Sequence, residues 1–196
     1  MVKNIKTSSD QDLILSFQKT QSQAAIGELI NRYKQNIYTT ILIKVKNKQI
    51  AEDIFQETFI KVVQTLLKDK YKECGKFLPW AIRIANNLCI DYFRKNKNAN
   101  KVKLKDNFDW LDGFCVNQDN GASQIEKLEL SNQIVQLLDK LPEAQREVIM
   151  LRIYADLSFK EIANILNVGT NTAMGRMRYG LSHLKKIIEE YDLILR

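Results

Sequence analysis

The chain has 196 residues, of which 45% are hydrophobic and 27% charged, with a formal net charge of +7 and a pI near 9.2. This length and composition exclude a wholly disordered chain and fit one large or two small domains, each with its own core. The basic excess suits a polyanion such as nucleic acid, but basic surfaces are common, so charge by itself does not identify the partner.

Cysteines and apolar runs exclude several further classes. Cys74, Cys89 and Cys115 are odd in number and far apart, which predicts reduced thiols rather than a disulfide framework or a zinc site. The N-terminus lacks the pattern of a secretory leader, and the most apolar run, residues 37–45, is too short to span a membrane. We therefore expect a cytoplasmic protein with no metal, no cofactor and no membrane partner.

Residues 11–97 follow helical periodicity, with apolar side chains three and four positions apart. We expect helices within 22–45, 51–67 and 77–98, and Pro79 is placed to open the last of them. The predicted buried stripes are Ile26, Leu29, Ile30, Tyr33, Ile37 and Ile41; then Ile54, Phe55, Thr58, Phe59, Val62, Val63 and Leu66; then Trp80, Ile84, Leu88 and Tyr92, flanked by Ala81, Ala85 and Cys89. No alternating pattern argues for a sheet, so the fold is predicted to be all-α and nucleotide-binding α/β enzymes are disfavoured.

The second expected helix carries a polar cluster opposite its apolar stripe. Asp53, Gln56, Glu57 and Gln64 fall there at helical spacing. Two carboxylates could act as a general acid and base, but no His, Ser or Cys stands nearby in sequence. A protein-binding face is favoured over a catalytic one, and a plain solvated face remains an alternative on spacing alone.

The third expected helix ends in a cluster of basic and aromatic residues. The polar members are Arg83, Asn86, Asn87, Arg94, Lys95, Lys97, Lys101, Lys103 and Lys105, set against the lone Asp91 and interleaved with Phe77, Trp80, Tyr92 and Phe93. Lysines and arginines neutralise phosphates and aromatic rings stack on bases, so single-stranded DNA is a plausible ligand. Trp80 and Tyr92 also fit ordinary core positions.

A second domain follows a linker. Residues 98–127 mix Asn, Asp, Gly and Lys without period and are predicted to be a flexible linker, in which Trp110, Leu111 and Phe114 form a small apolar cluster able to dock on something. Helical pattern returns over 128–191 and is interrupted at Pro142. The first domain is accordingly set at 10–97 and the second at 128–191.

The second domain ends in a predicted helix-turn-helix. Ser158 and Glu161 have capping-box spacing, so a helix should begin at Phe159, and Asn167 suits a left-handed turn position. The expected inner faces are Ile162, Ala163 and Leu166, then Ala173, Met177, Leu181 and Leu184. The remaining surface of the closing helix holds Thr172, Met174, Gly175, Arg176, Arg178, Tyr179 and Lys185. DNA binding in a major groove is favoured over an ordinary solvated hairpin, and the single histidine, His183, is interpreted as a surface or phosphate-contacting residue.

Taken in order, the segments AEDIFQETFIKV, FLPWAIRIANNLCIDYFRK and LPEAQREVIMLRIYADLSFKEIANIL with the closing helix resemble bacterial RNA polymerase sigma factors of the sigma-70 family, extracytoplasmic-function group. The resemblance covers nearly the whole chain outside the linker. It implies an alternative sigma factor, without a catalytic site, that binds core RNA polymerase and directs promoter recognition, DNA melting and transcription initiation. An anti-sigma factor or a recruiting protein would be a further partner.

The resemblance also assigns roles to residues. Residues 10–97 would be sigma region 2, with Asp53, Gln56 and Glu57 docking on the β′ clamp helices. The residues implied to bind single- and double-stranded minus-ten DNA are Lys76, Phe77, Arg83, Asn86, Asn87, Arg94 and Lys95. Residues 128–191 would be region 4, which holds the β flap and reads the minus-thirty-five element through Thr172, Met174, Gly175, Arg176, Arg178 and Tyr179. The linker would thread towards the active site and the RNA exit path.

The chain departs from the family pattern within the closing helix. The family often carries Lys or Arg and Ser where this chain has Met174 and Gly175, and Gly180 is a second glycine inside the helix, which costs helix propensity. Two alternatives follow: Gly175 lets the backbone approach DNA closely, or the helix reads bases weakly and depends on another protein for placement. The alternative function is a helix-turn-helix transcriptional regulator with a helical sensor domain. Such a regulator gives no reason for both the acidic helix and the aromatic-basic helix.

Overall fold

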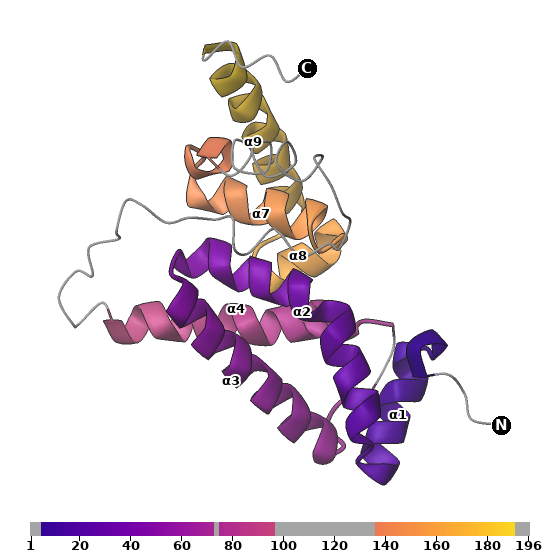
Figure 1. Cartoon of the computed structure of the whole chain (residues 1–196). Coiled ribbons are helices and arrows are strands. Elements are labelled where there is room, and N and C mark those ends of the chain that lie inside the picture. The colour runs from indigo at the N-terminus through magenta and orange to yellow at the C-terminus, as the bar shows by residue number, and fades with distance from the viewer. Residues whose placement is uncertain (1–4, 73–74, 97–135, 191–196) are drawn as a thin grey trace, which may run out of the picture. The chain divides into compact units, whose positions relative to one another are not determined.

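The computed structural model describes residues 5–72, 75–96 and 136–190, and every regular element within those ranges is a helix (Figure 1). The chain divides into two compact units, Met1–Asp106 and Asn107–Arg196, called here the N-terminal and C-terminal units. The all-α prediction is confirmed. The predicted boundaries at 97/98 and 127/128, the linker and the Trp110 cluster lie outside the described residues.

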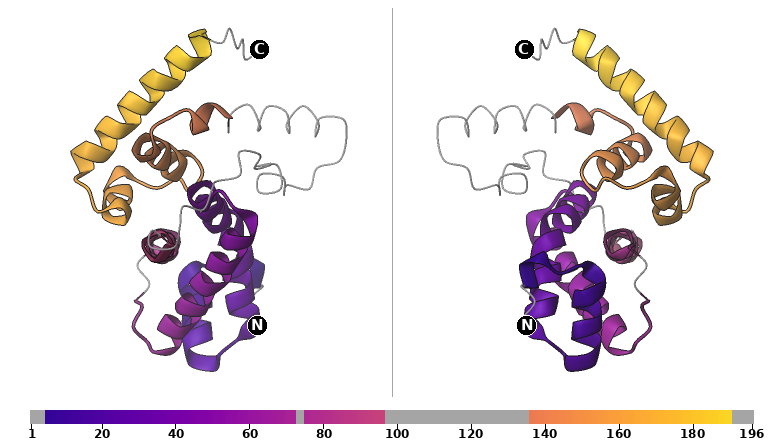
Figure 2. Two further views of the ribbon diagram at one scale, coloured as in Figure 1. Left: turned by 90° about the vertical axis from the view of Figure 1, so that its left-hand side faces the viewer. Right: turned by 90° about the vertical axis from the view of Figure 1, so that its right-hand side faces the viewer.

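The N-terminal unit packs four α-helices around one aliphatic core. They are α1 (Asp10–Thr20), α2 (Gln23–Val45), α3 (Lys48–Leu67) and α4 (Phe77–Asn96), preceded by the short 3₁₀ helix η1 (Ile5–Thr7). The long α2 packs against α1, α3 and α4. Figure 2 views α4 nearly end on, with α2 and α3 beside it. This arrangement leaves α3 and α4 each with one face against the core and one face in solvent.

Side-chain caps set where these helices begin. Ser9, Ser22 and Asn47 each accept a hydrogen bond from a backbone N–H in the first turn of α1, α2 and α3. Gln21 and Lys46, with φ of 50° and 51°, end α1 and α2 in the left-handed conformation. Only two residues therefore separate α1 from α2, and two separate α2 from α3, which keeps consecutive helices side by side.

The predicted buried stripes hold for α2 and α3 and are rotated in α4. Ile37 and Val62, for example, are fully buried, as their spacing predicts. On α4 the buried residues are Phe77, Ala81, Ile82, Ala85, Asn86, Leu88 and Cys89. Trp80, Ile84 and Tyr92, predicted as the centre of the stripe, are only half-buried. The predicted stripe was centred on its largest side chains, whereas the buried face of α4 is turned toward the flanking Ala81, Ala85 and Cys89.

The C-terminal unit contains α7 (Glu143–Ile153), α8 (Phe159–Leu166) and α9 (Thr170–Glu190), and α9 runs as one straight helix in Figure 2. The predicted capping box is confirmed: the Ser158 backbone N–H donates to Glu161 Oε2 (2.9 Å) and the Glu161 N–H donates to Ser158 Oγ (3.3 Å). Asn167 ends α8 in the left-handed conformation, as predicted, with φ of 52°. The inner face of α8 holds Ile162, Ala163 and Ile165, so Ile165 takes the place predicted for Leu166.

The contact between α7 and α9 differs from the prediction. Leu181, expected to face inward, is 47% exposed, and Gly180 is buried instead. A Cβ added at Gly180 would lie 2.7 Å from Ile149 Cδ1 and 3.2 Å from Gln145 Cβ. The glycine therefore permits a close approach of the two helices, and this requirement rotates Leu181 into solvent.

No helix among the described residues combines the length and apolar character that a membrane span requires.

Candidate polymerase and nucleic-acid interfaces

The exposed face of α3 is acidic at its start and aliphatic further along. Asp53, Gln56 and Glu57 are all exposed, as the sequence predicted for a binding face. Two large apolar residues, Ile60 at 55% and Leu67 at 49% exposure, continue the same face at helical spacing. Neither residue was predicted from the sequence as part of a binding face. Ile60 follows Asp53 by seven residues, or two helical turns, and Leu67 follows it by fourteen residues, or four turns. We call this surface the α3 face.

Charges on the α3 face are weakly paired. Glu57 lies 3.3 Å from Lys61 one turn on, and both side chains are about half exposed. Such an ion pair contributes little in water, on the order of 0.3–0.5 kcal/mol. The carboxylates and the neighbouring aliphatic side chains are thus available to a protein partner at small cost.

The exposed face of α4 is basic. Arg83, Asn87 and Arg94 recur at helical spacing along it, and Lys95 lies beside Arg94. Ile90, 45% exposed, falls on the same line. Arg94 forms an exposed ion pair with Asp91 at 3.1 Å. Lys76, just before the helix, is also exposed. Five of the seven residues predicted for minus-ten DNA therefore lie on or next to one surface, called here the α4 face.

Phe77 and Asn86 do not lie on that surface, because both side chains are buried, and their contact with DNA remains a prediction. Phe77 is 1% exposed, and its ring lies 5.5 Å from that of Tyr33, measured between centroids. Asn86 is 5% exposed, and its Oδ1 accepts a hydrogen bond of 2.7 Å from Lys44 Nζ. Both residues face α2 because the buried side of α4 is turned relative to the predicted stripe.

An aromatic cluster lies behind one edge of the α4 face. The Tyr71 ring stacks on Trp80 with a centroid distance of 4.1 Å, and Phe77 lies against both. Tyr71 is buried, whereas Trp80 is half-buried. The indole is thus held between the core and the basic surface. The sequence placed Trp80 correctly among basic residues but did not predict Tyr71 as its support.

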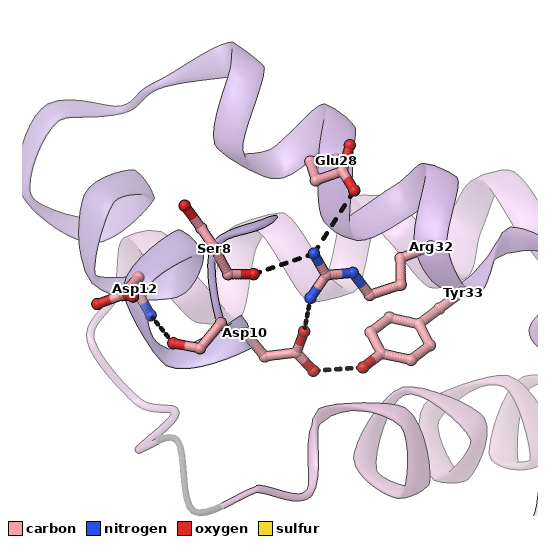
Figure 3. A network of polar contacts seen from close by, with 7 residues as sticks. Ser8, Asp10, Asp12, Glu28, Arg32 and Tyr33 are labelled. Atoms are coloured by element: carbon pink, nitrogen blue, oxygen red, sulfur yellow. Dashed lines mark hydrogen bonds and ion pairs between the residues drawn. The ribbon is translucent and has the colours of Figure 1, made fainter. Parts of the chain in front are cut away.

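A polar network joins α1 to α2, as Figure 3 shows. Arg32 pairs with Asp10 at 2.5 Å and donates to the Ser8 carbonyl at 3.1 Å, and Glu28 lies 3.5 Å away. The Tyr33 hydroxyl donates to the second Asp10 oxygen. Burial, and then the Asp10 carboxylate, raise the pKa of Tyr33 above its usual value, so Tyr33 remains a neutral donor. This network fixes the beginning of α1 on the bundle.

On α9, four of the six residues predicted to read DNA are exposed: Thr172, Met174, Arg178 and Tyr179. Gly175 and Arg176 are half-buried. The Arg178 guanidinium lies 5.1 Å from the Tyr179 ring centroid, so the two side chains form a cation–π pair.

Two neighbouring positions on α9 have distinct surroundings. A Cβ added at Gly175 would meet nothing within 4 Å, so a side chain at this position would extend into open space. His183 Nδ1 lies 2.9 Å from Gln145 Oε1, which places the histidine in the α7–α9 contact rather than at a phosphate. Among the described residues, no three His, Cys, Asp or Glu side chains are grouped to hold a metal ion.

Comparison with known proteins identifies both units. Residues 29–99 match the family model for sigma-70 region 2, and residues 137–186 match sigma-70 region 4. The chain is 32% identical over 176 residues to the ECF RNA polymerase sigma factor SigW of Bacillus subtilis, covering 88% of this chain and 93% of SigW. It is 29% identical to SigM of the same organism, over 73% of this chain and 82% of SigM.

Solved structures show the same fold. CnrH in complex with the cytosolic domain of CnrY superposes with a TM-score of 0.64 at 21% identity, over 93% of this chain and 99% of that one. The sigma factor RpoE in complex with the anti-sigma factor NepR from Bartonella quintana gives 0.64 at 18% identity, over 87% of this chain and 98% of that one. A regulator with a helical sensor domain is not favoured, because the N-terminal unit matches region 2. The chain belongs to the sigma-70 family, and it is an alternative sigma factor of the extracytoplasmic-function group, which directs transcription initiation.

Proposed function

We propose that this sigma factor docks on core RNA polymerase through the α3 face and opens minus-ten promoter DNA on the α4 face, while α9 contacts the minus-thirty-five element. In this proposal residues 10–97 act as region 2, 98–127 as the linker and 128–191 as region 4. Sigma factors are generally non-enzymatic initiation factors that act with RNA polymerase. We extend this to the present chain as an absence of catalytic activity and a place in the cytoplasm.

The observation that carries the proposal is that two opposite kinds of surface stand on neighbouring helices of one unit. The α3 face offers carboxylates beside Ile60 and Leu67, which suits a protein surface with basic and apolar groups. The α4 face offers arginines beside a half-buried indole, which suits phosphates and unstacked bases. Because α3 and α4 pack against each other, polymerase docking on one would place the other at a fixed position for melting.

For α9 we propose a weaker reader. The exposed Arg178 and Tyr179 would reach base edges in the major groove, and Arg176 would hold a phosphate. Met174 and Gly175 offer no hydrogen-bonding side chain, so preference at their positions would rest on a thymine methyl contact or DNA shape.

We expect the two units of the chain to contact different parts of the polymerase. The β′ clamp helices are the expected partner of the α3 face, and the β flap that of the C-terminal unit. RpoE is held by an anti-sigma factor in its structure, so we include an anti-sigma or recruiting protein among the expected partners of this chain.

The docking assignment is tested with the triple variant Asp53→Ala/Gln56→Ala/Glu57→Ala in the full chain. We expect its affinity for core RNA polymerase from a related bacterium, measured by equilibrium titration, to fall at least about tenfold, as for loss of an interface hot spot. The triple variant Gln11→Ala/Gln23→Ala/Asn31→Ala makes three exposed polar-to-alanine changes on α1 and α2, outside both proposed polymerase contacts, and serves as the control. Equal affinities of wild type and triple variant would refute the role of the α3 face.

The melting assignment is tested by salt dependence. Arg94→Ala/Lys95→Ala in the holoenzyme should weaken promoter binding on all sequences and reduce the slope of log K against log salt by about one per lost phosphate contact. The control is Lys19→Ala/Lys34→Ala, which removes two exposed positive charges from α1 and α2. A slope unchanged in the first variant, or reduced equally in the control, would contradict a specific DNA contact by the end of α4.

A further inference from the structure

α1 makes a direct contact with the segment that leads from α3 into α4. The Gln18 side-chain amide donates one hydrogen bond to Asp69 Oδ1 (3.0 Å) and one to the Tyr71 carbonyl (3.2 Å). The two contacts join residues that are 51 and 53 positions apart in the sequence. α1 lies outside residues 29–99, the part that matches the region 2 family model. Its contribution to the sigma function is therefore not assigned by the family match.

The segment that Gln18 contacts has a constrained backbone. Asp69 has a φ of 51°, in the left-handed region that costs an L residue free energy unless its surroundings hold it there. Asp69 N–H donates to the Leu66 carbonyl at 3.1 Å, which turns the chain sharply after α3. Gln18 holds the side chain of Asp69 and the carbonyl of Tyr71 together, so it fixes the outgoing direction of the turn.

The direction of this turn sets the place of Trp80. The buried Tyr71 ring stacks on the indole with an interplanar angle of 29°, so a shift of the Tyr71 backbone would move the surface on which Trp80 rests. At the other end of α1, Asp10 accepts from the Tyr33 hydroxyl, and the Tyr33 ring lies against Phe77. α1 is thus linked to the aromatic cluster from both of its ends, directly through the Tyr71 backbone and indirectly through Tyr33.

We propose that Gln18 is a positioning residue for promoter opening: it holds the Tyr71 backbone so that Trp80 is fixed at the edge of the α4 face before DNA arrives. The proposal rests on the proposed melting function of the α4 face. Gln18 itself touches no DNA in this scheme. Its effect should therefore be specific to strand opening and should be absent where the strands are already apart.

The first measurement concerns the free protein. With Trp110→Phe as background, Trp80 is the only tryptophan, since the chain has two. Gln18→Ala should raise the quenching constant of Trp80 fluorescence by acrylamide, while Gln11→Ala, at an exposed position of the same helix, should leave it unchanged. Unchanged quenching in Gln18→Ala overturns the proposal without any reference to transcription.

The second measurement concerns opening. A promoter is selected from a randomised library with the wild-type holoenzyme, and it is prepared as a duplex and as a premelted template. Gln18→Ala should slow open-complex formation on the duplex about fivefold to tenfold, the effect of one or two lost net hydrogen bonds, and leave the premelted template unaffected. Equal losses on both templates would show a general structural defect and overturn the proposal.

Charge-matched variants sharpen the result. Gln18→Lys supplies N–H donors to both oxygens and should restore duplex opening relative to Gln18→Ala, whereas Gln11→Lys adds the same charge without the contact and should have no such effect. An equal increase in the rate of duplex opening from Gln18→Lys and from Gln11→Lys would show that the added charge, and not the contact, is responsible. That result would overturn the positioning role. A wild-type holoenzyme that selects no duplex promoter would instead refute the proposed function, and the quenching result would stand on its own.

Discussion

The helices α4 and α9 have 20 and 21 residues, but they are attached to their units in different ways. α4 buries seven side chains, including Phe77 and Leu88, over residues 77–89. α9 buries only Ala173 and Gly180, and otherwise rests on half-buried side chains. The comparison indicates that α4 is attached mainly by the apolar surface that it buries in the N-terminal unit, whereas α9 is attached mainly by its close approach to α7 at Gly180. The two modes of attachment should respond differently to substitution.

The largest effect is expected from Phe77→Ala, because it removes a fully buried ring that contacts three other aromatic residues. The free energy of unfolding of the N-terminal unit should fall by about 3–5 kcal/mol. Hydrogen exchange of peptides from α4 would report the loss locally. Protection in α9 should not change, and an equal loss in α9 would contradict separate attachment of the two helices.

Gly180→Val should have the next largest effect, and it acts by overpacking a contact, whereas Phe77→Ala leaves a cavity. The added side chain overlaps Ile149 and Gln145, so it pushes α9 away from α7 rather than leaving a cavity. We expect the C-terminal unit to lose about 1–3 kcal/mol of stability. Chemical denaturation of Gly180→Val, of Ile149→Ala and of the double variant measures it as a double-mutant cycle, because Ile149 is itself buried. If the close contact is the cause, Gly180→Val should cost less stability in the Ile149→Ala background than in the wild type.

Ser158→Ala tests a local contribution to the C-terminal unit. It removes the hydroxyl that accepts the Glu161 N–H, so α8 should lose about 1 kcal/mol. Because α8 lies between α7 and α9 in sequence and packs on both, exchange protection should decrease in all three helices. Ser182→Ala, at an exposed position of α9, is the matched control. A loss of similar size in the control would show that the cap is not responsible.

Gly175→Ala should give the smallest change, and it should be stabilising. The position is open, so alanine gains up to about 1 kcal/mol of helix propensity without a clash. If the backbone approaches DNA at Gly175, promoter binding should weaken while thermal stability rises. Stronger binding together with higher stability would argue against a close approach at this position.

The sequence predicted elements whose signals are local. The Ser158–Glu161 pair, the left-handed Asn167 and the apolar spacing of α3 all depend on residues within one or two turns, and all are found in the structure. The roles assigned to the exposed residues of the α3 and α4 faces remain predictions. The apolar pattern did not predict how α4 and α9 are rotated about their axes, because small residues such as Ala81 and Gly180 lie in their helix–helix contacts.

Two misplaced residues show the physical reason. Gly180 was read as a cost in helix propensity, yet it marks the place where α7 comes closest. The sequence pattern groups Asn86 with the basic residues of α4, yet its amide oxygen accepts a hydrogen bond from a lysine on α2. Both outcomes depend on a partner more than 30 residues away in sequence, and no local periodicity encodes such a partner.

The hydrogen bond between Lys44 and Asn86 also has an entropic consequence. A free lysine side chain loses up to about 2 kcal/mol of conformational entropy when it is immobilised. Here the Lys44 ammonium group is already held at 2.7 Å from the Asn86 oxygen, so much of that loss is incurred during folding rather than during an encounter. A positive charge held in this way beside α4 should therefore lose less conformational entropy on binding a polyanion than a freely rotating lysine would.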